Sequence, residues 1–141
     1  MVRRTVLRLI DANGNRALEG VRVCEEIVRL SLNSGPIFRR LRALRHGIAI
    51  ALRRLPVDRA ELIRTRDTRR DVGRQAPGSR IASLEQLLII NLQRAKEALR
   101  TLEECARMLA PRHSAQFQRL RFHTYEIERT IILRLAAVRH R

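Results

Sequence analysis

The phrase RLIDANGNRALEGVRVCEE at residues 8–26 returns, in altered form, as IINLQRAKEALRTLEE at residues 89–104, and this repetition decides the fold. With Asn13 placed on Asn91, residues 13–29 and 91–107 share the pattern N-x-[NQ]-R-A-x-E-x-x-R-x-x-E-E-x-x-R. Alanine, leucine, arginine and glutamate dominate both copies, and these residues favour helix. The chain is therefore predicted to contain one helical unit twice.

Turn signals divide each copy into a helical hairpin. The Ser-Gly-Pro run at 34–36 is expected to end the first helix, and Pro111 does the same in the second copy. Ser83 is placed to cap the helix that opens the second copy, and a short helix is expected at 57–65. A weaker echo, FRRLR against FQRLR, indicates that the second helices of the hairpins also correspond, at 38–42 and 117–121.

These signals predict a single all-α domain over residues 1–141. The expected architecture is a helical bundle of two hairpins related by a pseudo-twofold axis, with a charged central loop. Its parts in chain order are a first repeat, a middle region that ends in the loop, and a second repeat, at 5–55, 56–82 and 83–138.

The chain is strongly basic, with 30 lysines and arginines against 14 aspartates and glutamates, for a net charge of +16. Nearly all of the cations are arginines spread along the whole chain, and few aromatic residues are present to stack on bases. Anionic ligands are thus expected, although they need not be nucleic acids. No run of eighteen apolar residues suggests a membrane span, and the start of the chain lacks the features of a leader, so a cytoplasmic protein is expected. Cys24 and Cys105 are predicted to be small buried residues.

Helical geometry turns the repeated asparagines toward the core. At 100° per residue, Asn13 lies on the apolar face with Arg16 at its margin, and Asn91 and Arg94 repeat this placement. Because buried polar groups are costly without partners, their recurrence calls for a reason. One interpretation is that the arginines pair with carboxylates such as Glu19 and Glu97 and fix the register of the bundle. The other is a polar pocket between helices, lined by asparagine, arginine and glutamate from both copies.

The remaining repeated charges have a simpler explanation. Arg22, Glu25 and Arg29 are spaced for i,i+3 and i,i+4 ion pairs along one helix, and their counterparts 78 residues later repeat the spacing. We expect these residues on solvated faces.

The middle of the chain carries RTRDTRRDVGR at 64–74, with five arginines and two aspartates. Arginine forks suit phosphate oxygens, and Asp67 and Asp71 are of the type that binds Mg²⁺. A solvated charged linker is the alternative interpretation of this loop.

Four segments together resemble a known family: the opening phrase, LRH at 44–46, RDTRRDVG at 66–73 and NLQRAKEALRTLEE at 91–104. They are similar to the small all-helical hydroxymethylpyrimidine-phosphate kinase domain of thiamine biosynthesis. That domain occurs alone or fused ahead of thiamine-phosphate synthase. The resemblance covers roughly residues 5–135.

The resemblance implies an ATP-dependent phosphotransferase that converts 4-amino-5-hydroxymethyl-2-methylpyrimidine phosphate to the diphosphate, with Mg²⁺. It implies the catalytic residues Arg16, Arg94, Asp67 and Asp71, the last two also as Mg²⁺ ligands. The implied substrate- and nucleotide-binding residues are Asn13, Asn15, Glu19, Asn91, Glu97, Arg45, His46, Arg66, Thr68 and Gly73. Our hypothesis is that Arg16, Arg94 and the loop arginines bind phosphates, that the loop aspartates hold Mg²⁺ with Glu19 or Glu97, and that the two asparagines read the pyrimidine.

Two other classes of function stay open at this stage. One is a non-catalytic helical module that regulates or binds a partner protein, and the other is an arginine-rich nucleic-acid-binding protein. Besides the small pyrimidine phosphate, thiamine-phosphate synthase and a second copy of the chain, in a homodimer, are candidate partners. No membrane partner is expected.

Overall fold

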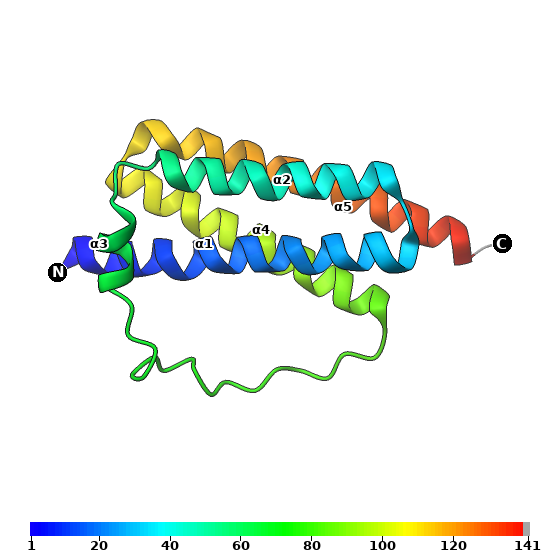
Figure 1. Ribbon diagram of the computed structural model, residues 1–141, viewed down its shortest axis with the longest axis horizontal. Helices are drawn as coiled ribbons and strands as arrows, with labels where there is room; N and C mark the ends of the chain where they lie inside the picture. The colour runs from blue at the N-terminus through cyan, green and yellow to red at the C-terminus, as the bar shows by residue number, and fades with distance from the viewer. Residues whose placement is uncertain (140–141) are drawn as a thin grey trace.

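The two repeats fold as two helical hairpins that pack against each other, and the computed structural model describes residues 1–139 (Figure 1). The first hairpin contains α1 (Val2–Ile27), a π-helical turn (Val28–Leu32) and α2 (Gly35–Arg54). The second contains α4 (Leu84–Leu109), a 3₁₀ turn (Pro111–His113) and α5 (Ser114–Arg139). A short helix, α3 (Arg59–Arg64), and residues 65–83, here called the connecting segment, link the hairpins. The predicted all-α helical bundle is confirmed, and no strand occurs in the described part of the chain.

Side-chain caps explain where α2 and α4 begin. Ser83 Oγ accepts a hydrogen bond of 3.0 Å from the backbone N–H of Gln86, which confirms the predicted cap of α4. Ser34 caps α2 in the same way, and Pro36 lies in the first turn of that helix, where a missing N–H is tolerated. The chain reverses just before, at Asn33, whose φ of 52° is left-handed. The Ser-Gly-Pro run therefore starts the second helix and does not end the first.

The hairpins meet where α1 and α4 cross in antiparallel directions (Figure 1). A Cβ added at Gly20 would lie only 3.0 Å from the backbone oxygen of Asn91, so the glycine permits a close approach. One turn further along, Cys24 Sγ donates to the backbone oxygen of Leu88 at 3.6 Å. Combined with the 78-residue correspondence, these two contacts place the pseudo-twofold axis level with the fully buried Ala17 and its counterpart Ala95.

The core shows how the second helices of the two hairpins correspond. Buried residues in and directly after α2 match buried residues of α5 at an offset of 76: Leu41, Ile48 and Leu55 correspond to Phe117, Thr124 and Ile131. The offset of 79 predicted from FRRLR and FQRLR is therefore wrong by nearly one helical turn. Because arginine and leucine recur on successive turns of both helices, the letters match in more than one register, and packing selects among them.

The two cysteines are buried free thiols, as predicted. Burial, together with the nearby Glu25 carboxylate, raises the pKa of the Cys24 thiol to about 12, and burial also raises the pKa of Cys105. Of the helices in residues 1–139, none combines the length and the apolar character needed to cross a bilayer.

Candidate functional site

A pocket of about 610 Å³ lies at the crossing of α1 and α4. Ten residues line it, five from α1 and five from α4, and each residue from α1 is matched by the residue 78 positions later in the chain. The pairs are Asn13 and Asn91, Arg16 and Arg94, Glu19 and Glu97, Gly20 and Ala98, and Val23 and Thr101. The two repeats therefore build one pocket, here called the central pocket, on the pseudo-twofold axis.

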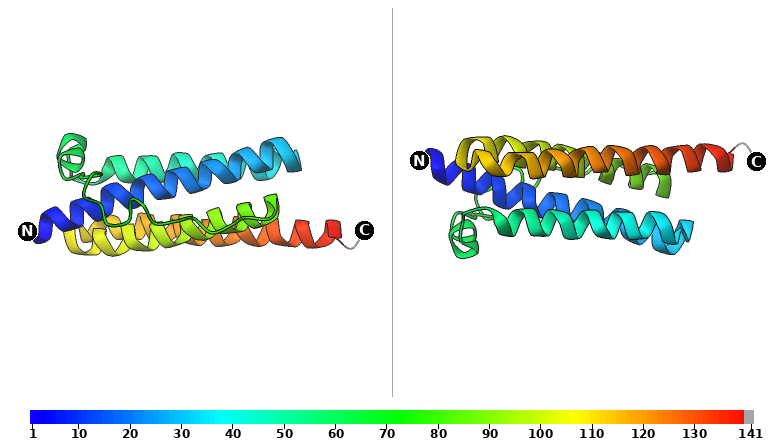
Figure 2. Two further views of the ribbon diagram at one scale, coloured as in Figure 1. Left: turned by 90° about the horizontal axis from the view of Figure 1, so that it is seen from below. Right: turned by 90° about the horizontal axis from the view of Figure 1, so that it is seen from above.

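The central pocket opens on the side of the bundle away from α2 and α5. Gly14 faces α2, since a Cβ there would lie 3.2 Å from the side chain of Leu52. Of the five lining residues of α1, Arg16, Glu19 and Val23 lie roughly 140–200° around the helix from Gly14. The connecting segment runs along this same outer side of α1 and α4, as Figure 1 and the view from below in Figure 2 show.

Both asparagines are buried in the floor of the central pocket, with exposed fractions of 6% for Asn13 and 4% for Asn91. Asn13 Nδ2 donates to the backbone oxygen of Leu9 at 2.9 Å, and Asn91 Nδ2 donates to that of Leu87 at the same distance. The predicted placement on the buried face is confirmed. The same hydrogen bond in both copies gives the two amides equivalent orientations.

The four charged residues of the central pocket are exposed and unpaired. Within residues 1–139, no carboxylate lies within 4.0 Å of the guanidinium groups of Arg16 and Arg94, and no cation lies as near to Glu19 and Glu97. The interpretation that these arginines fix the register through ion pairs is therefore wrong. Their charges remain available for a ligand.

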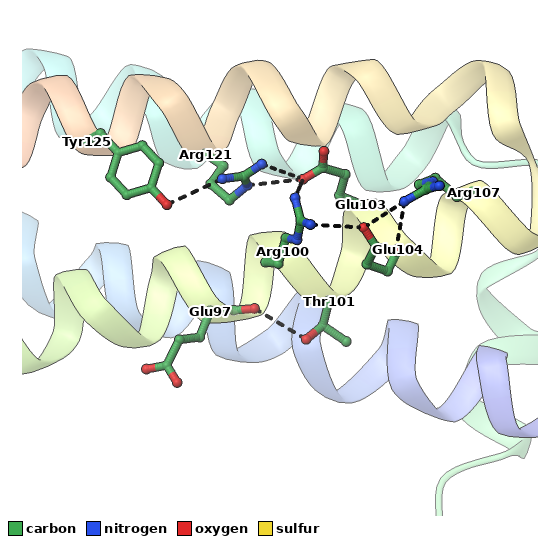
Figure 3. A network of polar contacts seen from close by, with 8 residues as sticks. All are labelled: Glu97, Arg100, Thr101, Glu103, Glu104, Arg107, Arg121 and Tyr125. Carbon is green, nitrogen blue, oxygen red and sulfur yellow. Dashed lines mark hydrogen bonds and ion pairs between the residues drawn. The ribbon is translucent and has the colours of Figure 1, made fainter.

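The register ion pairs are instead made by carboxylates that we expected on solvated faces. Glu25 is fully buried, and its carboxylate accepts from Arg45 Nε of α2 at 2.6 Å and from Arg22 at 3.1 Å. In the second copy, Glu103 accepts from Arg121 of α5 at 3.0 Å (Figure 3). The solvated placement predicted for the two glutamates is wrong because the inward partner comes from the other helix of each hairpin. The spacing along one helix cannot reveal that partner.

The two hairpins differ in the grooves beside the central pocket. In the groove between α4 and α5, Lys96 pairs with Glu128 at 2.8 Å, and Tyr125 Oη accepts from Arg121 at 3.3 Å (Figure 3 shows the latter). This hydrogen bond, and the pairing with Glu103, raise the pKa of the Arg121 guanidinium. The positions in the first hairpin that correspond to the lysine and its partner are the apolar Leu18 and Leu52.

A second cavity, of about 700 Å³, lies between α1, α2 and α3. Asp11 and Arg66 stand at its edge and form a two-pronged ion pair, with Nε and Nη2 of the arginine 2.8 and 2.7 Å from the carboxylate oxygens. This pairing raises the pKa of the Arg66 guanidinium. Asn15 lines the same cavity and not the central pocket.

Comparison with known proteins assigns the chain to a family. A sequence model of the ThiD2 family matches residues 8–130. The chain belongs to the ThiD2 family.

The relatives of this ThiD2 chain are longer proteins. A thiamine-phosphate synthase of Rhodopirellula baltica is 38% identical over 98% of the chain and 37% of its own length. Proteins of the same name from Gloeobacter violaceus and a Synechocystis strain are 37% and 36% identical over 96% and 87% of the chain, and 40% and 35% of their own lengths. The chain thus spans little more than a third of these relatives. No solved structure matches it.

Six of the residues predicted for the site come together in the central pocket: Asn13, Arg16, Glu19, Asn91, Arg94 and Glu97. Sequence reasoning missed the other four lining residues, which are apolar or small except for Thr101. The repeat alignment could have found them, since they are the residues that follow each glutamate on the same face.

The other predicted residues lie outside the central pocket. Arg45 is held by Glu25, His46 is exposed on α2, and Arg66 is held by Asp11. Asp67, Thr68, Asp71 and Gly73 belong to the connecting segment, where Asp67 accepts from the N–H of Arg70 at 3.2 Å and Asp71 from that of Gly73 at 2.8 Å. No cluster of three or more metal-binding side chains occurs within residues 1–139. In this conformation the two loop aspartates accept hydrogen bonds from the backbone of their own turns.

Proposed function

We propose that this chain is a kinase of thiamine biosynthesis that uses ATP to phosphorylate 4-amino-5-hydroxymethyl-2-methylpyrimidine phosphate to the diphosphate. The observation that carries the proposal is the central pocket, with one unpaired arginine from each repeat beside its axis. The thiamine-phosphate synthases that match the chain support the pathway, because they contain its counterpart within a longer protein of that name.

The reaction suits a pocket of this composition. An oxygen of the substrate phosphate attacks the γ-phosphorus of ATP, the bond to the β-phosphate oxygen breaks, and ADP leaves. Since the attacking oxygen is already anionic, no strong base is needed. The protein has to hold the substrate phosphate and the γ-phosphate of ATP in line and to offset the repulsion between these two anionic groups. Arg16 and Arg94 are placed to do this from opposite sides of the axis.

Magnesium fits the acidic residues of the central pocket. Mg²⁺ in nucleotide sites needs only one or two carboxylates besides phosphate oxygens and water. Glu19 and Glu97 are unpaired carboxylates in the pocket wall, so they would hold the ion, which when bound would neutralise phosphate charge. Asp67 and Asp71 would join them only if the connecting segment closes toward the pocket.

The deciding experiment is coupled detection of ADP release from ATP and the pyrimidine monophosphate. We expect turnover by the wild type, and a loss of about 100-fold or more in kcat/KM for Arg16→Ala and for Arg94→Ala, as for other pre-placed charges that act on phosphoryl transfer. Arg107→Ala is the matched control, because Arg107 is an exposed arginine of α4 that pairs with Glu104 outside the pocket. Absence of ADP from the wild type would overturn the kinase proposal.

The kinase would have a partner enzyme, and the two rival functions would give other experimental results. Because the relatives carry this region inside a thiamine-phosphate synthase, we propose that enzyme as the partner that receives the product. A non-catalytic module would show no ADP release. A nucleic-acid-binding protein would bind DNA or RNA with an affinity that falls steeply with salt, and the pyrimidine phosphate would not compete.

A further inference from the structure

The floor of the central pocket carries two hydrogen-bond acceptors of fixed orientation. At 2.9 Å from a backbone carbonyl oxygen, an asparagine amide can place only its nitrogen, because its own oxygen would be repelled. The Oδ1 atoms of Asn13 and Asn91 are therefore the free ends, and no donor from the described residues reaches either of them. Both residues are more than nine-tenths buried, and neither unpaired oxygen is fully enclosed, so each acceptor is open to a ligand only where its residue is exposed in the pocket.

The two acceptors lie apart, on either side of the arginines. Measured from the level of Ala17 and Ala95 on the pseudo-twofold axis, each asparagine is four residues away and each pocket arginine is one residue away. In antiparallel helices, this puts the two asparagines on opposite sides of the pseudo-twofold axis, about 12 Å apart along the direction of the helices. The two arginines are therefore near the centre of the pocket, and the two asparagine oxygens lie toward its opposite ends.

We propose that Asn13 Oδ1 and Asn91 Oδ1 each select an exocyclic amino group, so that each half of the central pocket takes one amino-substituted heteroaromatic ring. This inference rests on the proposed function for the identity of the rings, which are the aminopyrimidine of the acceptor and the adenine of the nucleotide. Both rings carry an amino group on a six-membered ring beside a ring nitrogen. With a ring in each half, the phosphate ends of the two ligands converge on Arg16 and Arg94.

The selection works through the difference between an amino and an oxo substituent. An amino group donates to Oδ1, whereas an oxo group at the same ring position brings an oxygen against an oxygen. The asparagine cannot turn its amide over to adapt, since Nδ2 is committed to the backbone of Leu9 or Leu87. Once a bound ring shields it from water, an acceptor that lacks a donor and faces a second acceptor discriminates strongly between such analogues.

The test compares amino and oxo forms of both ligands on the wild-type chain. The Kd values of ATP and inosine triphosphate are measured by calorimetry, and likewise those of the 4-amino pyrimidine monophosphate and its 4-oxo analogue. We expect at least a tenfold weaker Kd for each oxo compound, and a matching loss in kcat/KM where turnover occurs. A loss smaller than tenfold for either ligand overturns the proposal. If binding discriminates but no ADP forms, the kinase proposal fails while this inference stands.

Two variants separate recognition from a structural role of the asparagines. Asn13→Leu and Asn91→Leu keep the size of the side chain and remove the acceptor. We expect each variant to abolish the amino-to-oxo discrimination for one ligand and to leave it for the other. If both ratios stay at the wild-type value while affinity falls equally for amino and oxo forms, the asparagines act only through packing and the proposal is wrong. The ratio is taken within one preparation, so partial misfolding cancels, and the wild-type comparison decides even if a variant does not fold.

Discussion

Removing Arg45 should reveal how strongly the bundle depends on its buried carboxylates. In the variant Arg45→Ala, the fully buried Glu25 loses its 2.6 Å partner from α2 and keeps only Arg22, which is half exposed. Breaking a buried ion pair from one side costs about 3–5 kcal/mol, and the remaining arginine favours the lower end, about 3 kcal/mol. For a chain of 141 residues, an unfolding entropy of about 0.3 kcal/mol/K converts this loss into a drop in Tm of about 10 °C.

Thermal unfolding followed by far-UV circular dichroism is the assay, with Arg3→Ala as the control. Arg3 pairs with Glu61, but both side chains are substantially exposed, so its loss should cost at most about 1 kcal/mol, or about 3 °C. The double variant Arg45→Met with Glu25→Leu removes both charges from the interior, and it should recover most of the stability lost by the single variant. If Arg45→Ala melts no lower than Arg3→Ala, or if the double variant is no more stable than Arg45→Ala, the buried pair does not organise the hairpin.

Three further outcomes follow from the geometry. Burial raises the pKa of Cys24 to about 12 and also raises that of Cys105, so both thiols stay protonated below these raised pKa values. At pH 8 an alkylating reagent should therefore modify them only after denaturation. Rapid alkylation of the native protein would contradict their burial. Asp11→Asn weakens the ion pair with Arg66 that anchors the start of the connecting segment. Trypsin should then cleave that segment several-fold faster, as measured by mass spectrometry of the fragments. An unchanged cleavage rate would mean that this ion pair does not anchor the segment. Gly20→Ala should lower the free energy of unfolding by about 1 kcal/mol or more, because overpacking against the backbone of α4 outweighs the better helix propensity of alanine. Gly78 has open space around it, so Gly78→Ala should leave the stability unchanged in the same thermal melt.

The sequence predicted best what depends on one helix at a time. Periodicity placed Asn13 and Asn91 on the buried faces, and the cap at Ser83 located the start of α4, since both effects act over a few neighbouring residues. It failed where the partner lies on another helix. Glu25 looks solvated along α1 until α2 brings Arg45 to it, and no spacing rule within α1 contains that contact.

The loop marks the other limit of sequence reasoning. RDTRRDVG carries the residue types of a phosphate and Mg²⁺ site, but composition does not say where an extended segment lies. In the structure its aspartates accept hydrogen bonds from nearby backbone, at Arg70 and Gly73, because short polar side chains find local N–H groups before distant ligands. The position of the segment depends on contacts made by the folded chain, and the identity of its residues does not encode those contacts.

Pseudo-symmetry also sets a condition on any reaction in the central pocket. Donor and acceptor are different molecules, so a fully symmetric pocket would bind each of them in either half and would often hold two copies of one ligand. Positions that differ between the repeats, and the single connecting segment, can prevent this. Val23 opposite Thr101 and Gly20 opposite Ala98 differ in the pocket wall itself, and the ion pair of Lys96 with Glu128 has no charged counterpart in the first hairpin. The residues repeated in both copies, asparagine, arginine and glutamate, can thus supply affinity for amino and phosphate groups, while any difference between the two halves has to come from these unequal pairs and from the connecting segment, which occurs only once.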